Sequence, residues 1–359
     1  MFHYILKRLF YGILVLWGVV TLVFLLFNIL PGDASRMLLG QRADISSVEA
    51  IRKDLGLDKP LYIQYLNFLN DLSPVSLHNA DNPKSYWYLS RLKYPSAHIL
   101  IRFKHDVLVL KPPYLRRSYQ SKRDVSAIIA EAFPKTLLLA TAAILMAMFF
   151  GISLGIPAAL HKDSLYDRFM MVFSSLGMSV PSFFAAILIA WLFGFVWEKY
   201  TGLPMFGSLY SVDSYTGEVY LSLRNLILPA ITLGIRPLAI VISLTRSALL
   251  EELSKDYIRT AYAKGLTSAR VIFRHAMRNA MNPVITAITG WFASLLAGAV
   301  FVEYVFDWKG IGLVIVDALE KYDLPVLMGT VLFIAVILIL TNIMVDIIYA
   351  LLDPRVRLE

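Results

Sequence analysis

The sequence contains no cysteine and few charged residues. Without cysteine, disulfide bonds and thiol chemistry are excluded, although this absence says nothing about the compartment. Charged residues make up 17% of the 359 residues, whereas a soluble protein of this length carries about a quarter. Hydrophobic residues reach 58% and are concentrated in long runs. This composition is typical of a membrane protein.

The sequence also lacks the patterns of an ATP-binding P-loop and of a metal site. No G-x-x-x-x-G-K-[S/T] segment occurs, so the chain is not expected to bind ATP through a P-loop of its own. The formal charge is +8, but the placement of the basic residues around the apolar runs favours a membrane over a nucleic acid as partner. We expect no catalytic residue and no cofactor on this chain. A metal site is not expected either, because no ligand spacing links its six histidines, His3, His78, His98, His105, His161 and His275.

Six apolar runs are long enough to cross a bilayer, which requires about 20 residues per helix. Backbone amides in lipid have no water to bond, so each run should be helical. The first run lacks an A-x-A cleavage pattern at its exit, which favours a retained span over a signal peptide. The sequence thus predicts an all-α polytopic membrane protein with spans over Leu9–Leu30, Thr136–Leu160, Phe169–Trp197 (with Pro181 inside), Leu226–Thr245, Pro283–Val302 and Leu324–Leu352.

The basic residues predict the orientation of these spans. Six spans place both termini on one side, together with most of the Lys and Arg of the short loops, including seven from Arg246 to Arg278. Cytoplasmic loops carry such an excess. The predicted organisation is a cytoplasmic end and first span over 1–30, an extracytoplasmic loop over 31–135, a core over 136–352 with a cytoplasmic loop at 246–282, and a cytoplasmic tail over 353–359.

The long extracytoplasmic loop is predicted to hold local structure. A helix begins at Ser46 or Ser47, and a second amphipathic segment covers Leu61–Leu72. Prolines interrupt the stretch from Ser73 to about Leu115. Within it, alternating apolar residues flank Lys104-His105-Asp106 and predict a hairpin, namely Ile99, Ile101 and Phe103 before the turn and Val107 and Val109 after it.

The cytoplasmic loop is predicted to fold as two helices that meet at Gly265. The first covers Leu253–Lys264, and a glycine after it can adopt positive φ and end it. Thr267 or Ser268 can begin the second helix, which is expected to reach Asn282 before Pro283 opens the next span. The first helix carries small residues beside tyrosine at spacing four, a pattern that suits insertion into a cleft on a partner: Tyr257, Ala261 and Gly265.

The second helix of the loop carries Arg270, Arg274 and Arg278 on one face. Spacing of four places these side chains together, and Val271, Ile272, Ala276 and Met277 lie near another face. Two interpretations remain open for the arginines. They contact either anionic lipid headgroups or a protein partner.

The loop sequence resembles a known family. Asp256–Leu266 reads D-Y-I-R-T-A-Y-A-K-G-L, and Arg274–Ala280 reads R-H-A-M-R-N-A. These segments are similar to the EAA loop of ABC-importer permeases, in the form typical of the dipeptide/oligopeptide branch. The sequence departs from the general EAA pattern at three positions. Arg259, His275 and Arg278 stand where that pattern has glutamate, isoleucine and proline.

Other segments resemble the same branch, and only Ser73–Leu115 stands apart as an insert that the branch usually spans with a few residues. The similar segments are Leu30–Asp33, Leu55–Leu61, Arg117–Tyr119, Val302–Gly312 and Asp353–Arg357. The resemblance implies a six-helix type I permease fold in a bacterial cytoplasmic (inner) membrane. It also implies a partner permease chain, an extracytoplasmic peptide-binding protein, and two ATPases that hold ATP and Mg, so that this chain is not itself an enzyme.

The resemblance assigns one segment to ATPase contact. In the family, the short helix before the glycine sits in a groove on the ATPase and transmits its closure. The corresponding residues here are Asp256, Tyr257, Arg259, Thr260, Ala261, Tyr262, Ala263, Lys264, Gly265 and Leu266.

Arg236 is an unusual charge about ten residues, roughly 15 Å, into the fourth run. A charge at that depth is costly and normally faces a cavity or a partner. One hypothesis makes Arg236 a pathway residue near the carboxylate of a peptide; the alternative is an ion pair with Glu303. Asp346, near the end of the sixth run, is interpreted as a solvated or paired end residue, with proton coupling as the alternative.

Three other functions stay open at this point. A stand-alone secondary carrier or channel would use Arg236 and Asp346. An ABC permease for a nickel chelate or a sugar would share the loop motif. A receptor or adhesin built on the outer loop would leave the cytoplasmic motif unexplained.

Overall fold

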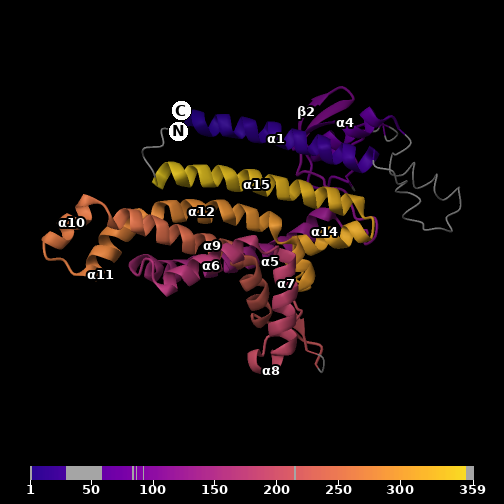
Figure 1. Cartoon of the computed structure of the whole chain (residues 1–359). Coiled ribbons are helices and arrows are strands. Elements are labelled where there is room, and N and C mark those ends of the chain that lie inside the picture. The colour runs from indigo at the N-terminus through magenta and orange to yellow at the C-terminus, as the bar shows by residue number, and fades with distance from the viewer. Residues whose placement is uncertain are drawn as a thin grey trace. The chain divides into compact units, whose positions relative to one another are not determined.

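The computed structural model describes residues 2–29, 59–82, 85, 87–91, 93–213 and 216–352, and most of them are helical (Figure 1). The helix predicted after Ser46 or Ser47 and the tail 353–359 lie outside the described residues. The elements are α1 (Phe2–Ile29), α4 (Leu61–Leu72), β1 (Val75–Asn79), β2 (His98–Phe103), β3 (Asp106–Leu110), α5 (Val125–Leu160), α6 (Leu165–Ser179), α7 (Ser182–Trp191), the π-helix η1 (Leu192–Val196), α8 (Glu198–Thr201), β4 (Tyr210–Val212), β5 (Val219–Leu221), α9 (Arg224–Leu253), α10 (Asp256–Ala263), α11 (Ser268–Arg270), the π-helix η2 (Val271–Ala276), α12 (Met277–Gly298), α13 (Val300–Val305), α14 (Ile311–Glu320) and α15 (Leu324–Leu352).

The chain divides into two compact units. The first contains Met1–Leu9, Ala132–Leu313 and Ile337–Glu359, and the second contains Phe10–Glu131 and Val314–Val336. The boundaries fall inside α1, α5, α14 and α15, so each of these helices contributes residues to both units.

Four helices in the described part of the chain are long and apolar enough to cross a membrane. They cover Lys7–Leu26 within α1, α5, α9, and Leu324–Ile347 within α15. The pair α6 and α7 passes the same test when taken together, which gives a fifth candidate. The predicted fifth run, Pro283–Val302, falls in α12 and α13; α12 begins with polar residues, Arg278 and Asn279 among them, and is not one of these candidates.

The third predicted run is broken rather than straight. The axes of Leu165–Ser179 and Ser182–Val196 are bent by 108°. The break lies at Val180, which has extended backbone angles (φ −72°, ψ 127°), followed by Pro181. A residue before proline is driven out of the helical region by its clash with the proline ring. The third predicted run thus consists of two helices that meet at a sharp bend, and the proline inside the run is the physical reason.

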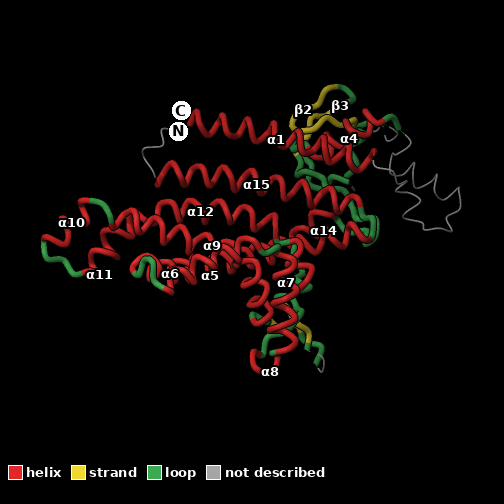
Figure 2. Tube along the Cα trace, in the orientation of Figure 1, coloured by secondary structure: helices red, strands yellow, loops and turns green. Residues whose placement is uncertain are grey.

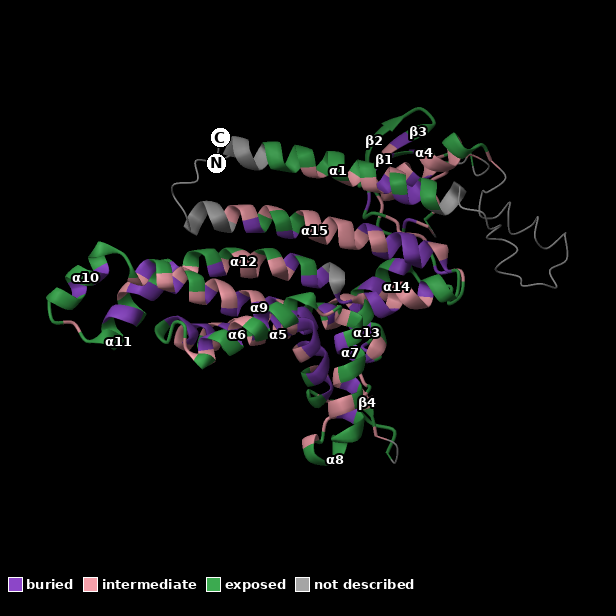
Figure 3. Ribbon diagram, in the orientation of Figure 1, coloured by how far each residue is buried: buried purple, intermediate pink, exposed green. Residues whose placement is uncertain are grey.

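The core of the first unit is built where α5 packs closely on α9. Leu139, Ala143, Leu228 and Leu233 belong to one buried cluster, which also includes Trp308. Figure 3 shows in purple how the buried residues are distributed along the helices. Gly151 and Gly155 of α5 face α9. A Cβ added to Gly155 would lie 2.9 Å from the carbonyl oxygen of Ile242, so only glycine permits this approach. The G-x-x-x-G spacing here serves helix packing.

Glu303 is fully buried and holds the start of α14. Its carboxylate accepts hydrogen bonds from Thr136 Oγ1 at 2.7 Å and from the backbone N–H groups of Gly312 at 2.6 Å and Leu313 at 3.3 Å. The first N–H groups of a helix have no partner within the helix and favour a negative charge. A Cβ on Gly310 would lie 2.4 Å from Oε1 of Glu303. Part of the Val302–Gly312 motif therefore has a structural role.

The second unit contains α4 and a three-stranded antiparallel sheet in the order β1-β3-β2. The predicted hairpin is confirmed: β2 pairs with β3, and Phe103 lies opposite Asp106 across the turn. Lys104 in that turn has φ +47°. The third strand, β1, was not predicted. The predicted segment Leu61–Leu72 is confirmed as α4.

A buried carboxylate joins α4 to this sheet domain. Asp71, only 4% exposed, accepts hydrogen bonds from Tyr94 Oη at 2.5 Å and Lys93 Nζ at 2.8 Å. Lys111 Nζ donates to the backbone carbonyl of Asp71 at 2.7 Å. Burial lowers the pKa of Lys111 to about 8, and the nearby carboxylate of Asp71 opposes this shift. The insert is thus fastened to α4 through paired polar groups.

Candidate functional site

The candidate site is a compact helical turn at one end of α9 and α12 (Figure 1). It is formed by α10, α11 and η2, and Figure 2 shows the loop between α10 and α11. These elements rest on a buried apolar cluster that joins them to α5, α9 and α12. The members of the cluster are Ala159, Leu249, Ile258, Ala261, Val271, Ile272, Ala276, Met277 and Ala280.

The boundaries of the two predicted helices differ from the structure in two places. The first helix was expected to begin at Leu253, but α9 continues to Leu253 and α10 starts at Asp256. The chain turns because Lys255 has an extended backbone (ψ 148°). The second was expected to stop before Pro283, yet α12 runs through that proline. A proline removes only one backbone donor, and its loss is tolerated within packed membrane helices.

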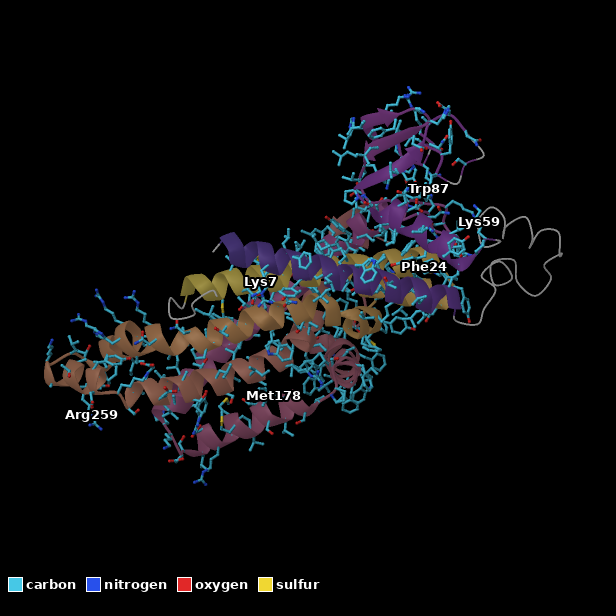
Figure 4. The ribbon with its side chains drawn as sticks, turned by 90° about the horizontal axis from the view of Figure 1, so that it is seen from above. Lys7, Phe24, Lys59, Trp87, Met178 and Arg259 are labelled. Carbon is cyan, nitrogen blue, oxygen red and sulfur yellow. The ribbon has the colours of Figure 1, made fainter. Side chains whose placement is uncertain are left out.

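One side of α10 faces solvent, and the other faces the apolar cluster. The side chains of Asp256 and Arg259 are 96% and 78% exposed, and Figure 4 shows Arg259 at the outer end of this turn. Ile258 and Ala261 are buried, at 2% and 7% exposure. Leu266 is half-buried, and the remaining candidate contact residues are exposed: Tyr257, Thr260, Tyr262, Ala263, Lys264 and Gly265.

Gly265 ends α10 with φ +76°, in the left-handed region. Its N–H donates to the carbonyl of Tyr262 at 2.9 Å, and the N–H of Leu266 donates to that of Ala261 at 3.4 Å. No atom lies within 4 Å of an added Cβ. The backbone angle, and not lack of space, therefore requires glycine here, as the sequence predicted.

Tyr257 connects α10 to two long helices, a link that the sequence did not reveal. Its hydroxyl donates to Glu252, in the last turn of α9, and accepts a hydrogen bond from Asn279 of α12 at 3.2 Å. Lys255 Nζ binds Glu252 at 2.5 Å. Burial and the bond to Glu252 raise the pKa of Tyr257, so its hydroxyl remains a donor. Glu252 itself is 8% exposed.

Arg270, Arg274 and Arg278 are all exposed, on the side of α11, η2 and α12 away from the apolar cluster. The four residues expected on another face, Val271, Ile272, Ala276 and Met277, are buried. This distribution agrees with both interpretations of the arginines.

A buried ion pair fixes the start of α6 against α9. Arg246 Nε lies 2.5 Å from Oδ1 of Asp167, and its Nη2 lies 2.7 Å from Oδ2. The side chain of Asp167 is 3% exposed and that of Arg246 is 20% exposed. Ser164 caps the same helix by accepting the N–H of Asp167. The sequence signal was a Ser-x-x-Asp box before an apolar run, which predicts a helix start but not the arginine partner.

Arg236 lies at the break between α6 and α7. Its Nε and Nη2 donate to the carbonyl of Val180 at 3.4 and 3.3 Å. The expected alternative partner, Glu303, is instead engaged by Thr136 and the start of α14. The half-buried guanidinium thus stabilises a carbonyl that the broken span leaves without a helical partner.

Asp346 pairs with Arg8 at 3.0 Å, and both belong to the first unit. Their side chains are 21% and 47% exposed. The interpretation of Asp346 as a paired end residue is confirmed.

Comparisons with known proteins identify the family. Residues 151–358 match the binding-protein-dependent transport system inner membrane component, and residues 1–81 match the N-terminal family of the same membrane component. The chain is 36% identical to the di/tripeptide transport system permease protein DppB of Pseudomonas aeruginosa, with 99% of each chain covered. It is 33% identical, with the same coverage, to a putative peptide permease protein of Brucella suis and to the glutathione transport system permease protein GsiC of Salmonella typhimurium.

The fold agrees with that family. The methionine ABC transporter MetNI, in inward-facing conformations, contains a chain that matches with a TM-score of 0.51 and 13% identity, over 64% of this chain and 97% of the other. The helical architecture is accordingly the type I permease fold. This chain, with its several membrane-spanning helices, belongs to the family of binding-protein-dependent transport system inner membrane components, the permease subunits of ABC importers.

Proposed function

We propose that this chain forms half of the path by which an ATP-driven importer carries short peptides across the bacterial inner membrane. Its partners are a second, similar permease chain, two cytoplasmic ATPases and an extracytoplasmic peptide-binding protein. The peptide substrate is supported by relatives named for di/tripeptide and glutathione transport. Both termini and the loop 246–282 face the cytoplasm in this proposal, because basic residues gather there.

The observation that carries the proposal is the geometry of α10. The helix offers an exposed polar side to a partner, while Ile258 and Ala261 fix its other side to the apolar cluster. Through Tyr257 it is bonded to Glu252 and Asn279. A displacement of α10 by a closing ATPase would thus act on α9 and α12 together. In this role Ala261 and the hydroxyl of Tyr257 position the helix, and the other exposed residues of α10 make the contact.

Reversing the exposed charge at α10 tests this assignment. Arg259→Glu should reduce co-purification of the ATPase subunits and lower peptide uptake in proteoliposomes about tenfold. Folding should be preserved, because the pair that Arg259 forms with Asp256 at 3.5 Å is exposed, and such pairs contribute little to stability. The amount of Arg259→Glu protein in the membrane should therefore equal that of the wild type.

Lys321→Glu is the matched control, since it reverses an exposed charge that pairs with Asp317 at 3.7 Å outside the loop 246–282. It should leave ATPase association intact. Equal losses of association in both variants, or none with Arg259→Glu, would contradict the assignment of the contact to α10.

Arg236 is proposed to face the path and to attract the carboxylate of the peptide. Two observations support this proposal. The guanidinium of Arg236 is half-buried and, within the described residues, forms no ion pair. Only its Nε and Nη2 donate hydrogen bonds to the carbonyl of Val180. Arg236→Gln keeps a donor for Val180 but removes the charge. We expect uptake to fall severalfold while ATPase association is retained. Loss of assembled complex with Arg236→Gln would instead assign Arg236 a structural role.

A further inference from the structure

The helix α4 contacts the membrane-spanning helix α1 well inside its apolar run. Phe68 packs on Phe24 with ring centroids 5.7 Å apart, and the hydroxyl of Tyr65 lies 2.6 Å from Thr21 Oγ1. Within the described side chains, the candidate span of α1 extends to Leu26. Thr21 therefore lies about 7.5 Å or more inside the end of the span along the helix axis. Figure 4 shows α4 beside this part of α1, near Phe24.

Beside the residues that contact α1, α4 carries three apolar side chains that are exposed. Leu61, Tyr62 and Leu66 are 40%, 66% and 47% exposed. In the same turns of α1, Leu22, Leu25 and Leu26 are also exposed. The exposed apolar surface of α1 thus continues onto α4. Because α1 is a candidate membrane span, the lipid that surrounds it can also reach α4.

The amide side chains of α4 are all paired within the chain. Gln64 donates to the carbonyl of Lys59 at 2.8 Å, and Asn67 accepts the indole N–H of Trp87 at 2.7 Å. Asn70 donates to the carbonyl of Leu77 at 3.0 Å. Such pairing is required where water is absent, because an unsatisfied polar group in hydrocarbon costs several kcal/mol. Asp71, the sole charged residue of α4, is buried in its own ion pairs.

We propose that α4 is embedded in the membrane surface, with Leu61, Tyr62 and Leu66 among the lipids of the leaflet at the C-terminal end of α1. In this proposal α4 is an interfacial helix, whereas the rest of the loop after the first span is predicted to lie in water. Apolar side chains at the boundary between acyl chains and headgroups hold such helices in place, and Tyr62 is of a type enriched there. The sheet of the insert is then held at the membrane surface through Asp71.

The absence of cysteine allows a direct test. Leu66→Cys and Lys104→Cys, each labelled with nitrobenzoxadiazole, would be prepared in the full chain with its partner subunits and reconstituted in lipid nanodiscs. The probe at Leu66 should emit at shorter wavelength, be quenched by nitroxide-bearing lipids and be protected from iodide. The probe at Lys104, exposed in the hairpin turn of the same insert, should be quenched by iodide.

Two outcomes would overturn the proposal. Iodide quenching at Leu66 equal to that at Lys104 would place α4 in water. Protection from both iodide and lipid nitroxides would show that a protein covers this face. Tyr62→Cys, at the most exposed of the three positions, repeats the test in case the probe at Leu66 disturbs the packing of α4.

Discussion

Replacing Arg246 with methionine is expected to lower the free energy of unfolding by about 3 kcal/mol. The substitution leaves the carboxylate of Asp167, 3% exposed, without its cation. The N–H of Asp163, 2.9 Å from Oδ2, is then its main remaining partner. A buried charge that loses its partner retains the full cost of its desolvation. The intrinsic fluorescence of the six tryptophans provides a thermal unfolding signal for the purified protein.

The double variant Asp167→Asn with Arg246→Met should recover much of this loss, because no charge is then left unpaired. A double-mutant cycle measures the coupling directly. The control is Arg117→Met, which breaks a pair with Asp124 at a similar distance, 2.8 Å, but with side chains 59% and 51% exposed. It should cost less than about 1 kcal/mol. If Arg117→Met and Arg246→Met were equally destabilising, burial would not be the decisive factor.

The second large effect is expected at Gly265. Valine at φ +76° suffers strain of about 1–2 kcal/mol, which the loop can relieve by changing the direction of α10. If α10 is the ATPase contact, this displacement should lower peptide uptake about tenfold. Because a Cβ there meets nothing within 4 Å, the amount of folded protein should change little. Uptake per ATP hydrolysed, measured in proteoliposomes, separates loss of coupling from loss of protein.

Gly265→Asn is the informative control, since asparagine adopts the left-handed region more readily than other non-glycine residues. It should transport at close to the wild-type rate. Equal defects in the asparagine and valine variants would point to the side chain at the interface as the cause, and normal transport by the valine variant would refute the need for this backbone angle.

The predictions that succeeded rest on local physics. Three correct predictions depend on residues close together in the sequence. They are the end of a helix at Gly265, the hairpin turn at Lys104-His105 and the apolar runs of bilayer length. The errors arose at the ends of such elements. Pro181 breaks its span whereas Pro283 does not interrupt α12, and the surrounding helices decide which outcome applies.

The partners of the charged residues were beyond the reach of sequence spacing. Arg246 and Asp167 lie in different helices, and Glu252, Tyr257 and Asn279 come from three. Each side chain alone reads as an ordinary surface or end residue. Arg236 was recognised as costly from its depth in an apolar run, but its acceptor, the carbonyl of Val180, has no side-chain signature.

The sequence by itself determined that this is a helical membrane protein with a loop motif of the importer type and a local insert after the first span, because composition and short-range pattern suffice for these. Only the tertiary structure decided which face of α10 is free, which polar groups are paired, and how α4 lies against α1. Those properties depend on contacts between residues far apart in the chain, such as Tyr65 with Thr21, whose free energy exists only once the helices have packed.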